Sequence, residues 1–116
     1  ISEYDPQINL PNLNGVKVDI EMYENLWVAD YNYTVFPSVN DTEWYGKWYW
    51  HKKDVMKFFR QAIKRLLSEN EEELLYDSVI VCISSHGGDR CIISSDGTKL
   101  NIQQMIDKIG PINMDF

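Results

Sequence analysis

The stretch Tyr76-Asp77-Ser78-Val79-Ile80-Val81-Cys82-Ile83-Ser84-Ser85-His86-Gly87-Gly88 decides which fold the sequence predicts. Its middle, from Val79 to Ser84, consists mainly of β-branched aliphatic residues between a polar entry and a Gly-Gly exit. A short apolar run of this kind is typical of a strand that is covered on both faces of a parallel sheet. Ligands of open α/β sheets bind just beyond the carboxyl ends of such strands, so the pattern predicts a site at His86.

Two features of the residues around His86 favour a catalytic role. Gly87 and Gly88 allow backbone conformations in which an N–H turns toward a ligand. Histidine side chains titrate near neutral pH, so His86 could activate a nucleophile while a neighbouring N–H stabilises an oxyanion. The same pattern also fits a histidine that only forms a hydrogen bond within a loop. Even in a catalytic role, His86 and the neighbouring N–H would form only half of a site.

The composition limits the class of protein. The 116 residues suffice for one small domain, and 44% hydrophobic and 13% aromatic residues fit a globular core. A net charge of −7 argues against nonspecific nucleic-acid binding and against anionic membrane surfaces. The sequence contains neither the roughly 20 apolar residues of a transmembrane helix nor a signal-peptide pattern. The two cysteines, Cys82 and Cys91, do not suggest a disulfide framework, so a reducing, cytoplasmic location is expected.

Apolar residues that recur every three or four positions predict three helices. The clearest of them has a wide apolar stripe on one face and lysines and arginines on the other, which indicates a solvated face. Asn101 is the expected N-cap of the last helix, and Gly110-Pro111 is its expected end. The expected helices cover approximately residues 16–28, 53–68 and 102–109.

Strands are expected where residues alternate or flank turn signals. Aromatic and polar residues alternate over residues 31–36, and Asp96-Gly97 between two apolar runs is a strong hairpin signal. Residues 1–4 fit the end of a strand, whereas residues 69–73 form an acidic run that is expected to be a linker. This order of elements predicts an α/β sandwich with a mostly parallel sheet.

Residues 41–50 contain five aromatic side chains without a clear period. They fit a loop packed on the domain edge better than a ligand platform, because basic residues are not interleaved as on surfaces that stack nucleic-acid bases. His51 follows this run and is interpreted as incidental.

Together these patterns resemble the caspase-like cysteine peptidases, which comprise caspases, metacaspases and paracaspases. The strand that ends in Ser84-Ser85-His86-Gly87 is similar to the one that carries the family's catalytic Ser-His-Gly, and residues 94–100 are similar to the hairpin that follows it. Residues 10–19 resemble the loop and helix after the family's first strand, and the resemblance is weakest over residues 38–50. It implies a caspase-like three-layer α/β sandwich with a mostly parallel sheet, incomplete in residues 1–116, which would form a single partial domain.

The resemblance also implies a reaction. His86 would be the general base of a Cys–His dyad, and the Gly87 N–H would contribute to the oxyanion hole. A polypeptide substrate would then be hydrolysed through a thioester acyl-enzyme, with no metal and no cofactor. In caspases the cysteine lies about 50 residues beyond the histidine, whereas 30 residues follow His86 in this chain. The nucleophile is therefore expected beyond the end of the chain.

The two cysteines of the chain are weaker candidates for the nucleophile. Cys82 precedes His86 by four residues, so their Cα atoms would lie ~13 Å apart in an extended strand, and Cys82 is expected in the core. Cys91 lies across the loop from His86, outside the family's motif position, and remains an open alternative. Caspases that cleave after aspartate carry an arginine where this chain has Leu13, which leaves the cleavage specificity open.

These patterns lead to hypotheses from different functional classes. The first is a fragment of a cysteine-type endopeptidase, completed by the other half of the same domain or by a homodimer. The second is a catalytically inactive caspase-like module that serves as an interaction domain or scaffold in signalling. A third, an unrelated α/β domain that binds a small molecule, lacks a G-x-G-x-x-G or Walker pattern. Without its first strand and its cysteine-bearing strand the sheet would have unpaired edges, so the chain alone is expected to be marginally stable and inactive.

Overall fold

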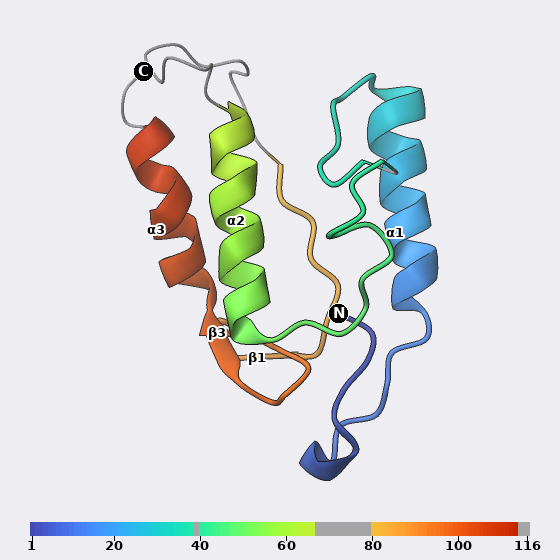
Figure 1. The fold of residues 1–116 in the computed structure, drawn as a ribbon, viewed down its shortest axis with the longest axis vertical. Coiled ribbons are helices and arrows are strands. Elements are labelled where there is room, and N and C mark those ends of the chain that lie inside the picture. The colour runs from blue at the N-terminus through green and yellow to red at the C-terminus, as the bar shows by residue number, and fades with distance from the viewer. Residues whose placement is uncertain (39, 67–79, 114–116) are drawn as a thin grey trace.

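The structure, a computed structural model, describes residues 1–38, 40–66 and 80–113 of the chain. Figure 1 shows α2 and α3 side by side, α1 on the opposite side of the molecule, and a small sheet below α2 and α3. Within the described residues, none of the helices is long and apolar enough to cross a membrane. In chain order the elements are the 3-10 helix η1 (Pro6–Ile8), α1 (Val16–Glu24), the π-helix η2 (Asn25–Asp30), α2 (Lys52–Leu66), β1 (Gly87–Gly88), β2 (Cys91–Ile93), β3 (Lys99–Asn101) and α3 (Ile102–Asn113).

The helix predictions are largely confirmed. The expected helix over residues 16–28 is present as α1 and η2, and the helix expected over residues 53–68 is present as α2, whose last expected residues lie outside the described part. The amide of Gln104 donates to Oδ1 of Asn101 at 3.1 Å, which confirms Asn101 as the cap of α3. The predicted end at Gly110-Pro111 is wrong, because α3 continues to Asn113. A proline removes one backbone donor, and in α3 this does not end the helix.

The sheet contradicts the expected caspase-like sandwich with a mostly parallel sheet. Its three strands follow the order β1-β2-β3, and each pairs with the next in antiparallel register. The hairpin predicted at Asp96-Gly97 is confirmed, since it joins β2 and β3, with Gly97 at a φ of +86° that favours glycine. The strand predicted over residues 31–36 is wrong, because these residues follow η2 without joining the sheet.

The described part of the run that was expected to be the central strand, residues 80–84, does not pair with the sheet. The first part of the run, residues 76–79, lies outside the described residues, and residues 80–84 form no strand. Ile80, Val81 and Ile83 expose 49%, 46% and 40% of their surface. Cys82 is exposed as well, so its predicted core position is wrong. An apolar run becomes a strand only when neighbouring strands pair its backbone groups, and in the described part of the chain it has no such neighbours.

The core lies where α2 and α3 cover the sheet. The aromatic run over residues 41–50 packs against this core as an edge loop, as the sequence predicts. Trp44 is 3% exposed, and its ring stacks on Trp50 with a centroid distance of 5.1 Å and meets the edge of Phe58. The buried cluster consists of Val55, Phe59, Ile92, Leu100 and Met105.

The first five residues hold the loop before α2 and the hairpin together. The amides of Ser2 and Glu3 donate to the carbonyl of Trp48, and the amide of Asp5 donates to the carbonyl of Ser95 at 2.8 Å. Residues 1–4, expected as the end of a strand, are therefore hydrogen-bonded to loop residues but form no strand and lie outside the three-stranded sheet. This arrangement buries Tyr4, which is 5% exposed, next to β1 and β2.

Candidate functional site

His86 lies immediately before β1, and Tyr4 fixes its backbone. The carbonyl of His86 accepts the amide of Ile93 at 2.9 Å, as in a regular antiparallel ladder. The amide of His86 instead donates to the hydroxyl of Tyr4 at 2.8 Å, and this hydroxyl donates to the carbonyl of Ile93 at 3.0 Å. The Tyr4 hydroxyl thus takes the place of the second ladder bond. Burial raises the pKa of Tyr4, so the phenol stays protonated and can donate.

The imidazole of His86 is oriented by a backbone carbonyl. Its Nε2 lies 2.7 Å from the carbonyl oxygen of Pro11. Because a carbonyl can only accept a hydrogen bond, Nε2 carries the proton, and in the neutral imidazole Nδ1 is left as a proton acceptor. The ring of Tyr4 meets the imidazole in a T-shaped contact, with centroids 4.7 Å apart. The general base predicted from the sequence is therefore a half-buried imidazole with a defined tautomer.

Gly87 presents its N–H at the edge of the sheet. It lies opposite Ile92, between the hydrogen-bonded pairs His86–Ile93 and Gly88–Cys91, so it occupies a non-hydrogen-bonded position. Backbone groups at such positions point away from the paired strand, and β1 is an edge strand. The histidine and the two glycines were expected in a loop after a parallel strand, and the structure instead places both glycines within an antiparallel strand. The outward N–H of Gly87 remains suitable as an oxyanion donor.

Cys91 lies across the hairpin from these residues. It pairs with Gly88, and its Sγ is 3.2 Å from the position that a Cβ of Gly88 would occupy. Side chains alternate along strands, so Cys91 and His86 lie on the same face as diagonal neighbours, for which Cα separations of ~7–8 Å are typical. Among the described residues, no thiol lies within hydrogen-bond distance of His86. The structure thus brings Cys91 near the histidine without forming a dyad.

The loop that holds His86 also contains Leu13. The amide of Leu13 donates to the carbonyl of Ser2 at 2.8 Å, which keeps residues 11–13 beside the N-terminal segment. The amide of Tyr4 donates to Oδ1 of Asn12 at 2.9 Å and strengthens the same connection. Leu13, the residue expected to bear on cleavage specificity, therefore lies two positions after the Pro11 carbonyl that orients the His86 imidazole.

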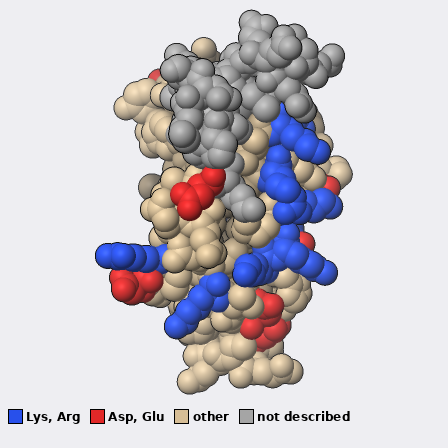
Figure 2. All heavy atoms as spheres, turned by 90° about the vertical axis from the view of Figure 1, so that its left-hand side faces the viewer, with Lys and Arg blue, Asp and Glu red and all other residues tan. Residues whose placement is uncertain are grey.

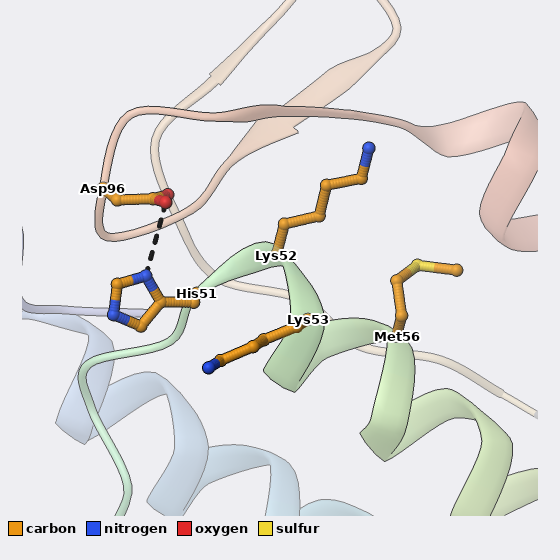
Figure 3. Close-up of a pocket in the computed structure, with 5 residues that line it drawn as sticks. All are labelled: His51, Lys52, Lys53, Met56 and Asp96. Atoms are coloured by element: carbon orange, nitrogen blue, oxygen red, sulfur yellow. Dashed lines mark hydrogen bonds and ion pairs between the residues drawn. The ribbon is translucent and has the colours of Figure 1, made fainter.

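The sequence did not indicate a second group of polar residues, which surrounds His51. Figure 3 shows His51, Lys52, Lys53, Met56 and Asp96 around a shallow pocket at the start of α2, with Nδ1 of His51 3.3 Å from Oδ2 of Asp96. The hydroxyl of Ser94 donates to Asp96 and holds the pKa of this carboxyl well below its usual range, and His51 adds to the effect. His51 and Asp96 are 45 residues apart, so no local spacing indicated the pair.

Within the described residues, no group of three or more His, Cys, Asp or Glu side chains is arranged to hold a metal ion. No protein-family model, no curated protein and no solved structure matches this chain.

Proposed function

We propose that this chain carries the general-base half of a cysteine-type endopeptidase, with His86 as the base and a nucleophilic cysteine outside residues 1–116. The resemblance of the residues around His86 to caspase-like peptidases suggests this reaction. The observation that carries the proposal is the 2.7 Å contact between Nε2 of His86 and the carbonyl of Pro11, because it leaves Nδ1 as the proton acceptor.

The proposed reaction follows from this tautomer. Nδ1 of His86 takes the thiol proton, and the thiolate attacks the peptide carbonyl while the Gly87 N–H donates to the developing oxyanion. The imidazolium passes this proton to the leaving amine, which separates as the first product. Nδ1 then deprotonates a water molecule that hydrolyses the thioester. Throughout, the Nε2–H bond to the Pro11 carbonyl keeps the ring oriented.

Two observations favour specific alternatives. The hairpin register places Cys91 on the face of His86, which makes it a second candidate for the nucleophile. The lack of any described thiol in contact with His86 favours the other functional class, an interaction module or scaffold that does not catalyse a reaction.

The test is covalent labelling of the complete gene product that contains this chain. Peptidyl fluoromethyl ketones that end in Asp, Arg or Lys are applied to the folded protein, and the labelled cysteine is mapped by mass spectrometry. We expect a label on a cysteine outside residues 1–116, lost in His86→Ala. The matched control is His51→Ala, which removes the chain's other histidine and should keep the label.

Three outcomes separate the hypotheses. A label on Cys91 that disappears in both Cys91→Ser and His86→Ala would transfer the nucleophile to this chain. Labelling that persists in His86→Ala would refute His86 as the base. A folded protein that no probe labels would overturn the peptidase proposal and favour the scaffold.

A further inference from the structure

Helix α2 carries a concentration of positive charge that contrasts with the rest of the chain. It contains six of the 11 Lys and Arg residues and one of the 18 Asp and Glu residues. The remainder of the chain therefore has five basic and 17 acidic residues. A helix with five net positive charges within a chain of net charge −7 is a local feature that the overall composition conceals.

Four of these residues form one straight stripe. Lys53, Lys57, Arg60 and Lys64 are spaced by four, three and four positions, which places them on one face of the helix. All four are exposed, whereas Val55 and Phe59 on the opposite face are 5% and 6% exposed. At 1.5 Å per residue the stripe is ~17 Å long. Figure 2 shows Lys and Arg side chains gathered in a band down one side of the molecule.

The stripe is only partly neutralised within the chain. Nζ of Lys57 lies 2.9 Å from Glu43, and Asp54, which is off the stripe, pairs with Lys47 at 3.7 Å. No acidic side chain in the described part of the chain lies within ion-pair distance of Lys53 or Arg60. Like charges three and four positions apart repel each other and destabilise a helix, so an acidic partner would relieve this repulsion.

We infer that the α2 stripe, defined as Lys53, Lys57, Arg60 and Lys64, is a docking surface for an acidic segment of a partner polypeptide. The stripe is one residue wide, and its length matches about five extended residues at 3.3 Å each. A longer polyanion would extend over the strongly acidic remainder of the chain, where it is repelled. Charge and dimensions therefore favour a short acidic peptide segment over a nucleic acid. This inference does not depend on the proposed catalytic role of His86.

Binding of a short acidic peptide tests the inference. Fluorescein-labelled hexaglutamate is titrated with the 116-residue chain at low ionic strength, and the Kd is measured by fluorescence anisotropy. Hexaglutamine of the same length and a single-stranded DNA of the same charge are the comparison ligands. We expect hexaglutamate to bind, its affinity to fall as salt is added, and both comparison ligands to bind more weakly.

A pair of matched variants localises the binding. Lys53→Gln/Arg60→Gln should weaken hexaglutamate binding about three- to tenfold, given the usual size of exposed charge pairs. Lys17→Gln/Lys99→Gln removes the same charge from α1 and β3 and should leave the Kd within about twofold. Circular dichroism confirms that both variants are folded. No binding, equal loss in both variants, or DNA binding as tight as hexaglutamate would overturn the inference.

Discussion

The hydroxyl of Tyr4 connects the N-terminal segment to the candidate site. It accepts the amide of His86 and donates to the carbonyl of Ile93, so it bridges two backbone groups that have no direct bond to each other. The sequence separation of 82 residues between Tyr4 and His86 explains why no local pattern indicated this role. The same applies to Pro11, which lies 75 residues before the imidazole it orients. The sequence pattern could therefore single out His86 and Gly87, and it could not supply the residues that position them.

Replacing Tyr4 by Phe should measure the strength of this connection. The substitution leaves one donor and one acceptor without a partner at a buried position, so we expect a loss of about 2 kcal/mol in the free energy of unfolding. Urea denaturation is the measurement. Tyr49→Phe is the control, because it removes a hydroxyl that donates to Asp5 from a less buried position, and it should cost clearly less than Tyr4→Phe. Equal losses in the two variants would contradict the structural role of Tyr4.

The lowered pKa of Asp96 leads us to expect that the stability of the fold depends on pH. The Ser94 hydroxyl, whose residue is fully buried, lowers the pKa of Asp96, and the pairing with His51 lowers it further. A carboxyl with a lowered pKa in the folded state stabilises the fold above its unfolded pKa of about 4, and this contribution is lost as the pH falls. The stability difference between the wild type and Asp96→Asn, about 1 kcal/mol at neutral pH, should therefore shrink between about pH 4 and pH 2. A difference that stays constant over this range, measured by urea denaturation, would refute the pairing.

Among the elements, the helices were predictable and the sheet was not. The apolar periodicity of α2 and the cap at Asn101 are properties of neighbouring residues, so the sequence alone indicates them. The Asp96-Gly97 turn also depends on neighbouring residues, so the sequence alone indicates it. Strand pairing depends on which segments meet in space, and the apolar run over residues 80–83 carries no information about its partners. The expected parallel sheet was wrong for this reason.

The exposed run allows a direct test of the corrected fold. Ile83→Ala should cost under about 1 kcal/mol in unfolding free energy, because Ile83 is 40% exposed. In a buried central strand the same substitution would cost about 2–5 kcal/mol. A measured loss in that higher range would contradict the position of residues 80–84 outside the sheet.

The core between the hairpin and α3 should be sensitive to truncation of a side chain, unlike the exposed run that contains Ile83. Leu100 of β3 is 2% exposed and packs in the buried cluster, so Leu100→Ala should cost about 2–5 kcal/mol. Ile106 of α3 is 52% exposed, and Ile106→Ala should cost under about 1 kcal/mol. Comparable losses in these two variants, measured by urea denaturation, would mean that α3 does not cover the sheet as described.

The molecule as a whole is elongated, with extents of 45 × 30 × 24 Å and a radius of gyration of 15.0 Å. A compact domain of this length has a radius of gyration of about 13 Å. The candidate site nonetheless combines segments that are far apart in the sequence: Tyr4, Pro11, and the hairpin of β1 and β2. The orientation of His86 is therefore a property of the folded molecule and should disappear when the chain unfolds.

Long-range ¹H–¹⁵N NMR correlations of the imidazole nitrogens test whether His86 is an oriented base. For the neutral imidazole of His86, we expect that Nε2 is protonated and Nδ1 is not, and that urea abolishes this preference. His51 provides an internal comparison, because its Nδ1 faces Asp96 and its tautomer should be the opposite one. Protonation of Nδ1 in His86, or the same mixture of tautomers in the folded and the unfolded chain, would contradict the proposed role of the Pro11 carbonyl and of His86 as the base.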